Sequence, residues 1–409
     1  MIEQLKKIHL ENNTQQQSLL RAVELGIPSM KNEEWKYTYY NKILQQGFTT
    51  ISSNTSPTSA VNIDEIATYI EANSVSENKL IFINGFFHNE LSSWQNQPKI
   101  NFWNNNNCTE TNSDDFLVEL NNALTTDGVF IEIDKNFILQ DLIEIFYINT
   151  NSTVITNIKN RIKVGENSQL KIAEYYINYD NSPAYNNIVT DIEIAPHAQV
   201  EWYKIQDGGE WLNITDNTHI MQAASAICNV VTITLTGNII RNVLQFDVNG
   251  ERCESHMNGL YLLQNEEHVD NRTLVNHNVP NCESFELYKG ILGGKSTGVF
   301  NGKIVVAQAA QKTNAFQSNR NLLLSNDANI YTKPQLEIFA DDVKCSHGAT
   351  SSQIEDSELF YLQARGIGKE MARGLLVYAF AAEILEKLKH EGLKSKLENR
   401  VAELLKIEL

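Results

Sequence analysis

The feature that most limits how this chain can fold is a long stretch, from Gly128 to Pro334, in which apolar and polar residues alternate. Runs such as Val129-Phe-Ile-Glu-Ile, Ile188-Val-Thr-Asp-Ile-Glu-Ile and Val230-Val-Thr-Ile-Thr-Leu-Thr are rich in β-branched residues. This period and this composition are typical of strands. No part of the stretch has helical periodicity long enough for a crossover helix. The pattern therefore disfavours a doubly wound α/β sheet and predicts a mainly β fold.

A short internal repeat within this stretch predicts how the strands are connected. Val164-Gly-Glu-Asn-Ser-Gln-Leu-Lys, Ile194-Ala-Pro-His-Ala-Gln-Val-Glu and Leu324-Ser-Asn-Asp-Ala-Asn-Ile-Tyr align without gaps. Each copy joins an apolar strand end to a new strand through turn-forming residues, with Asn167 and Asn326 at the corners. Such corners are typical of a β-solenoid, whose coils would vary in length because the copies are unevenly spaced. A β-sandwich with similar hairpins is the alternative.

The segments on either side of the alternating stretch have a different sequence pattern, with helical periodicity and polar loops. On the N-terminal side we expect helices over 2–25, 63–70 and 115–124, a strand from Lys79, a polar loop over 52–59 and an Asn-rich linker over 95–114. On the C-terminal side we expect helices from Asp356 to Gly366, from Lys369 to Lys389 and from Leu393 to Ile407. These last helices would cap an exposed end of the solenoid, dock a partner, or do both.

These expectations divide the chain into three parts. They are an N-terminal helical and mixed region (1–125), a β-helix core (126–354) and a C-terminal helical domain (355–409). The formal net charge of −17 comes without a basic block, which argues against binding to nucleic acid or to an anionic membrane surface. The sequence has neither a signal peptide nor an apolar stretch of membrane-spanning length, so we expect a cytoplasmic protein. Its five cysteines make no disulfide framework.

Two kinds of catalytic or binding motif are disfavoured by the sequence. Gly290-Ile-Leu-Gly-Gly-Lys-Ser-Thr resembles a phosphate-binding loop, but Lys289 stands where that loop needs glycine and a strand follows in place of a helix. We therefore expect this chain to bind no nucleotide. No Gly-x-Ser-x-Gly elbow marks a nucleophile. Because some β-helix proteins cleave polysaccharides with groove carboxylates, a carbohydrate-active enzyme remains an alternative, although such enzymes are mostly exported.

Soft metal ligands are unevenly placed, with seven between residues 253 and 347: Cys253, His256, His268, His277, Cys282, Cys345 and His347. No Cys-x2-Cys pair indicates a zinc ribbon. In a strand, Cys345 and His347 would share one face at roughly 6–7 Å, and both suit iron or zinc. The pair follows Asp341, Asp342 and Lys344, a charged setting in which we expect an exposed Cys345 thiol to have a lowered pKa.

Two ligands do not make a closed metal site, so the Cys345–His347 pair would need a partner chain to complete it. The alternative is that Cys345 and His347 are two unrelated strand residues. Cys253 and His256 would point to opposite faces of their strand, and we interpret both as structural.

Several segments of the chain resemble one protein family. They are Asp341-Asp-Val-Lys-Cys-Ser-His-Gly-Ala-Thr, Glu358-Leu-Phe-Tyr-Leu-Gln-Ala-Arg-Gly-Ile, Gly26-Ile-Pro, Asn32-Glu-Glu-Trp-Lys-Tyr-Thr, Asn265-Glu-Glu-His-Val-Asp-Asn-Arg-Thr, and Gly302-Lys-Ile-Val-Val with Ala310-Gln. Together they resemble the SufB/SufD family of the SUF iron–sulfur cluster assembly system, and within it the SufD proteins. The resemblance covers the chain from about residue 26, although the N-terminal 125 residues match only loosely beyond the Trp35 segment.

The resemblance implies a right-handed parallel β-helix with helical regions at both ends. It implies a non-catalytic scaffold that pairs with a SufB-like paralogue and docks a SufC-like ABC ATPase on its C-terminal helices, supporting iron entry into nascent clusters. His347, with Cys345 beside it, would bind iron or a transient cluster shared with the SufB-like partner. Because an unpaired strand edge invites a partner, the chain alone would form a homodimer.

A SufB-type paralogue that builds the cluster itself is the closest alternative. SufB-like proteins carry a sulfur-accepting cysteine just before a Leu-rich strand, which here reads Leu322-Leu-Leu-Ser, but the matching stretch Ser318-Asn-Arg-Asn has none. They also tend to have Glu after the matching histidine, where this chain has Gly348. Both departures favour a SufD-type protein.

Overall fold

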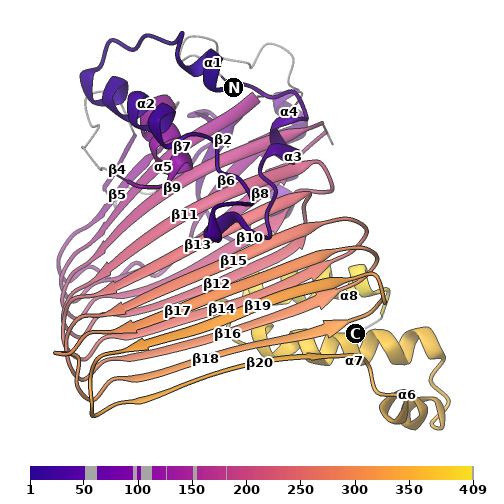
Figure 1. Cartoon of the computed structure of the whole chain (residues 1–409). Helices are drawn as coiled ribbons and strands as arrows, with labels where there is room; N and C mark the ends of the chain where they lie inside the picture. Colours follow the sequence, from indigo (N-terminus) through magenta and orange to yellow (C-terminus); the bar gives the residue numbers. More distant parts are fainter. Residues whose placement is uncertain are drawn as a thin grey trace.

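The structure is a computed structural model of the whole chain (Figure 1). It describes residues 1–50, 62–94, 99–102, 113–125, 127–150, 154–180 and 182–407. The expected loop over 52–59, most of the expected linker over 95–114, and Cys108 lie outside these residues.

Two long sheets form the body of the molecule, and successive strands alternate between them (Figure 1). The first sheet contains β4 (Lys99–Phe102), β5 (Val129–Ile133), β7 (Val154–Val164), β9 (Ala184–Ile194), β11 (Leu212–Gln222), β13 (Ile239–Val248), β15 (His268–His277), β17 (Thr297–Val306) and β19 (Asn329–Ile338), with β1 (Thr49–Thr50) beside β7. The second contains β3 (Phe86–Phe87), β2 (Asn78–Ile83), β6 (Ile143–Asn149), β8 (Gln169–Asn178), β10 (Gln199–Asp207), β12 (Ile227–Thr236), β14 (Glu254–Leu263), β16 (Glu283–Leu292), β18 (Asn314–Leu323) and β20 (Lys344–Ser352).

From β5 to β20 each strand pairs in parallel with the strand two places further along the chain. This connectivity makes a parallel β-solenoid of about eight turns with helices at both ends, which confirms the solenoid and excludes the sandwich. The space between the sheets is filled by a continuous cluster of inward-facing apolar side chains that extends from Leu80 to Ala340. Antiparallel pairing of β2 with β3 and of β4 with β5 ends the sheets at the N-terminal end.

The three repeat copies all lie at corners of the solenoid, which confirms the prediction. Asn167 and His197 adopt left-handed backbone, with φ of 56° and 60°, where the chain passes from the first sheet to the second. Asn tolerates this conformation better than most residues, which explains part of the Asn abundance. The Leu324 copy instead lies at the opposite corner, between β18 and β19. Asn326 therefore lies at a corner, as predicted, although its backbone is not left-handed.

The N-terminal helices lie near the first coils: α1 (Ile2–Leu5), α2 (Asn13–Leu25), the 3-10 helix η1 (Glu33–Trp35), α3 (Asn41–Leu44), α4 (Ile63–Asn73) and α5 (Phe116–Leu124). The helices expected near 63 and 115 are confirmed, and the side chains of Asn62 and Asp115 cap them. A single helix over 2–25 is wrong. The Asn12 side chain accepts hydrogen bonds from the backbone of Thr14 and Gln15, and so starts a new helix after a break.

Three C-terminal helices follow the last coil: α6 (Asp356–Gln363), α7 (Lys369–Leu385) and α8 (Glu391–Leu405). Val377, Ile384 and Leu397 join an apolar cluster with outward-facing residues of the second sheet, so α7 and α8 lie along its outer face. Residues of β20 remain largely exposed. The interpretation of these helices as an end cap is therefore wrong, because they flank the solenoid and leave its last coil open.

No helix among the described residues is long and apolar enough to cross a membrane. The division of the chain at residues 125 and 354 stays a prediction.

Candidate functional site at the open end of the solenoid

Strand β20 is the last strand of the second sheet, and within the described part of the chain it pairs only with β18. The Lys344 N–H donates to the Thr313 carbonyl at 2.9 Å. Because backbone groups alternate in direction along a parallel strand, those of Ser346, Gly348 and Thr350 also face β18. The backbone groups of the alternate residues face away from β18, toward the unpaired edge of β20. These residues are Cys345, His347, Ala349 and Ser351. The edge of β20 thus presents a regular row of donors and acceptors.

The edge of β19, the last strand of the first sheet, is less complete. Asn329 and Phe339 donate their N–H groups to carbonyls of Ser296 and Val306, so odd-numbered residues face β17. Pro334 lies in the middle of the strand and faces the open side, where it has no N–H to donate. A strand that extends the solenoid would therefore find its more complete partner in β20.

Cys345 and His347 both lie on the inward side of β20. Their register partners on β18 are Ala315 and Gln317, which are buried inside the solenoid. Cys345 is half-buried against the core, whereas His347 is exposed at the open end. Burial raises the pKa of the Cys345 thiol. The expectation of a lowered pKa is therefore wrong, because it assumed an exposed thiol.

Behind His347 lies a column of polar side chains that the sequence reasoning missed. Gln317 Nε2 donates to Glu286 Oε2 at 3.0 Å, and the Thr273 hydroxyl donates to the same oxygen at 2.7 Å. Burial raises the pKa of Glu286 to about 7. Glu286, Gln317 and His347 occupy equivalent positions in successive coils. The coil repeat, about 30 residues, is the signal that would have found them.

We expect the Glu286→Gln variant to be less sensitive to pH than the wild-type protein. The pKa of Glu286 in the folded chain is about 7, above its ordinary 4.5, so the folded state holds this proton more tightly. The stabilisation that protonated Glu286 contributes to the folded state is therefore lost as the pH rises from 4.5 to about 7, and the loss amounts to about 3 kcal/mol. Urea unfolding at pH 5 and pH 7.5 measures the difference. Equal pH dependence in both proteins would contradict the burial of an ionisable group there.

Two further cysteines lie close together deeper in the solenoid. Cys253 and Cys282 are fully buried on neighbouring coils, and each lies within hydrogen-bonding distance of the Gly250 carbonyl, at 3.0 and 3.2 Å. The Cys253 thiol and nearby His277 lower the pKa of Cys282, and the interaction raises that of Cys253. The structural interpretation of Cys253 fits this burial.

The remaining histidines of the sequence cluster are dispersed. His256 points outward and stacks on Phe285 with ring centroids 5.2 Å apart. His268 is covered by the N-terminal segment, where its ring lies 2.9 Å from the Thr38 hydroxyl. The structure therefore brings Cys345 and His347 to one place and separates His256 and His268 from them.

The Trp35 and Asp270 segments of the resemblance meet on the outer face of the first sheet. The Thr38 hydroxyl donates to Asp270 at 2.7 Å, and buried Arg241 forms an ion pair with Asp270. The Arg241 guanidinium also lies 3.9 Å from the centre of the Trp35 ring. These contacts fasten the N-terminal segment to the solenoid.

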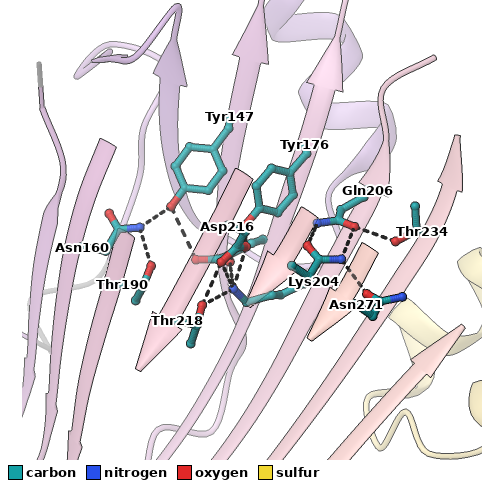
Figure 2. A network of polar contacts seen from close by, with 12 residues as sticks. Tyr147, Asn160, Tyr176, Thr190, Lys204, Gln206, Asp216, Thr218, Thr234 and Asn271 are labelled. Carbon is teal, nitrogen blue, oxygen red and sulfur yellow. Dashed lines mark hydrogen bonds and ion pairs between the residues drawn. The ribbon is translucent and has the colours of Figure 1, made fainter. Parts of the chain in front are cut away.

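The solenoid interior also holds a buried ionic cluster, drawn in Figure 2. Lys204 Nζ lies 2.8 and 2.7 Å from the two carboxylate oxygens of Asp216 and donates to Thr218 at 2.6 Å. The Tyr176 hydroxyl donates to Asp216 at 2.6 Å, and Glu174 lies 3.7 Å from Lys204. The pKa of Glu174 is raised, chiefly by burial. This cluster lies several coils away from the open end.

The segment resembling a phosphate-binding loop has a structural role. Residues 290–297 span the end of β16, a corner and the start of β17. Lys289 is buried and forms an ion pair with Glu383 of α7. Across the described residues, no group of three or more His, Cys, Asp or Glu side chains is arranged to hold a metal ion.

Known proteins resemble this chain over most of its length. A family model described as the SufBD core domain of SUF-system FeS cluster assembly matches residues 146–380. An iron–sulfur cluster assembly SufBD family protein of Synechocystis is 32% identical over 406 residues, which cover 92% of this chain and 87% of that protein. The iron–sulfur cluster assembly protein SufD of Escherichia coli is 28% identical over 401 residues, covering 95% and 92%. Chloroplastic ABCI7 of Arabidopsis thaliana is 31% identical over 253 residues, covering 61% and 53%.

Proposed function

Because this chain belongs to the SufBD family of SUF-system iron–sulfur cluster assembly proteins, we propose that it is a non-catalytic scaffold subunit of SufD type. It pairs with a SufB-like paralogue, docks a SufC-like ABC ATPase, and supports iron entry into nascent clusters in the cytoplasm. Iron or a transient cluster is the cargo of the assembly, and nucleotide binds the ATPase alone. Family membership favours this role over a carbohydrate-active enzyme.

The open last coil is the observation that carries this proposal. An exposed strand edge is a template for a strand of another chain, and the edge of β20 keeps its full row of backbone groups. Cys345 and His347 lie beside that edge at the mouth of the solenoid interior. A partner that extends the sheet would therefore bring its own side chains up to them. Two ligands from this chain and further ligands from the partner would complete an iron site.

The C-terminal helices support docking of an ATPase. Helix α6 buries none of its residues, and it exposes 71% of Phe360 and 57% of Tyr361. Aromatic side chains so exposed are typical of protein–protein contacts. Helices α7 and α8 anchor this surface to the solenoid. A movement of the ATPase would thereby reach the second sheet, which ends at β20.

A SufB-type role for this chain is less favoured. The stretch Ser318-Asn-Arg-Asn, which matches the segment where SufB-like proteins have a sulfur-accepting cysteine, contains none, and Gly348 replaces the expected Glu. The described chain therefore supplies fewer sulfur and iron ligands at these positions than a SufB-type protein would.

Co-expression with SufB-like and SufC-like proteins tests the proposed function. The complete set is expected to co-purify as one complex with iron and the visible absorbance of a cluster, and omission of this chain should reduce both. Unchanged iron and absorbance without this chain would contradict the role in iron entry.

A proline at position 349 tests the pairing edge. The Ala349 N–H faces the open side of β20, and the preceding Gly348 tolerates a following proline. We expect Ala349→Pro to preserve the fold and to weaken pairing by roughly tenfold, because one interface hydrogen bond is lost and the ring adds bulk. Dimer dissociation of the isolated chain and co-purification with the SufB-like partner measure it.

Thr350→Pro is the matched control, because the Thr350 N–H faces β18 within the chain. This change should lower the melting temperature of the isolated chain. Normal pairing by a folded Ala349→Pro variant would show that β20 is not the pairing edge.

A further inference from the structure

The interior of the last coils contains hydrogen-bond acceptors without donors. Gln317 and Glu286 are each 3% exposed, and among the described residues the Oε1 atom of each has no hydrogen-bond partner. Thr332 Oγ1, on β19, is also buried without a partner. Similar unsatisfied atoms occur elsewhere in the described chain, but Gln317 is the one that precedes the exposed His347 in the stack of coils. Because buried polar atoms are nearly always satisfied, its free oxygen calls for a donor from that side.

The orientation of the Gln317 amide is fixed by its neighbours. Its Nε2 donates to Glu286 on the preceding coil, and Glu286 is held by Thr273. Gly302 faces the amide across the interior, where a Cβ atom would lie only 2.1 Å from Gln317 Nε2. Glycine at this position therefore makes room for the amide. With the nitrogen directed toward β16, the amide oxygen is left for the next coil, whose register partner is His347.

We propose that Gln317 is the positioning residue for His347, accepting a hydrogen bond from one imidazole N–H when a partner closes the open end. The other ring nitrogen is then directed outward to ferrous iron at the interface. Histidine ligands usually donate their second N–H to such an oxygen, which fixes the tautomer and the ring orientation. Glu286, on the preceding coil, accepts the hydrogen bond from Gln317 Nε2 and so fixes the orientation of the amide. The inference deepens the proposed function and rests on it.

Ferrous iron titration of the metal-free complex under anaerobic conditions tests this inference. Gln317→Met keeps the length of the side chain and removes the acceptor, and it should raise the iron concentration for half-loading by about tenfold or more. Gln317→Glu restores an acceptor oxygen and should load close to wild type. Gln206→Met is the matched control, because Gln206 is a buried glutamine of the same interior that bonds Asn242 and Thr234.

The outcomes separate a positioning role from a structural one. Weaker loading in Gln317→Met alone, with rescue by Gln317→Glu, supports the proposal. Equal effects of Gln317→Met and Gln206→Met would overturn it, because both would then report a loss of stability or of a buried water. Unchanged loading of Gln317→Met beside a loss in His347→Ala overturns this inference alone. Unchanged loading of His347→Ala overturns the proposed iron site itself.

Discussion

His347→Ala is expected to reduce the iron content of the co-expressed complex by at least about tenfold, because a direct ligand contributes more to metal affinity than the outer-shell groups whose loss costs that much. The fold should survive the change. His347 is exposed on the last coil, outside the apolar core, so its truncation leaves no cavity. Iron per complex, cluster absorbance and co-purification of the partners measure the effect.

A matched histidine and the neighbouring thiol sharpen this test. His256→Ala removes a partly exposed imidazole from the outer face of the same sheet, and it should leave iron loading unchanged. Cys345→Ala should have the smaller effect, because burial keeps that thiol protonated and a poorer ligand. Full iron loading of an intact His347→Ala complex would contradict the assigned role. Loss of the complex itself would instead assign His347 to pairing.

The sequence allowed the solenoid to be predicted because both of its determinants are local. Alternation of apolar and polar residues specifies strands, and the turn residues around Asn167 and His197 specify the corners. The prediction was incomplete or wrong where a local pattern has two structural meanings. The Leu324 copy resembles the other corners in residue type but connects the sheets in the opposite direction. The Asn12 cap divides a segment whose apolar spacing suits one helix.

The candidate site was predictable only in part for a different reason. Cys345 and His347 are neighbours in sequence, so strand periodicity alone places them on one face. Whether that face is inward depends on the register with β18, which decides that Cys345 is half-buried and its pKa raised. Gln317 and Glu286 become neighbours of His347 only through stacking of successive coils. Their roles therefore follow from the coil repeat, which no local window contains.

The buried ionic cluster drawn in Figure 2 offers a direct test of how far the stability of the interior depends on complete polar networks. Lys204 is the cation between Asp216 and Glu174, whose side chains are 2% and 0% exposed. The Lys204 ammonium group also lies over the Trp202 ring, with Nζ 4.5 Å from its centre. Replacement by methionine would keep an unbranched side chain at this position and remove the charge, its hydrogen bonds and the contact of the ammonium group with Trp202.

Lys204→Met is expected to lower the free energy of unfolding by about 3–5 kcal/mol, because it leaves buried carboxylates without their cation. Without Lys204, the pKa of Glu174, which burial already raises, rises further in the folded chain, so the folded state binds this proton more tightly than the unfolded one. The loss should therefore be greatest at pH 7.5 and smaller at pH 5.5. Urea unfolding followed by circular dichroism at both pH values measures it.

A compensating variant distinguishes lost charge balance from lost packing. Lys204→Met combined with Asp216→Asn and Glu174→Gln removes all three charges at similar volume, and it should recover most of the stability, because a neutral buried group costs far less than an unpaired ion. The triple variant should also lose the extra pH dependence. A single variant that loses less than about 1 kcal/mol at pH 7.5 would mean that water reaches these carboxylates. A triple variant as unstable as the single one would assign the loss to the contact of Lys204 with the Trp202 ring.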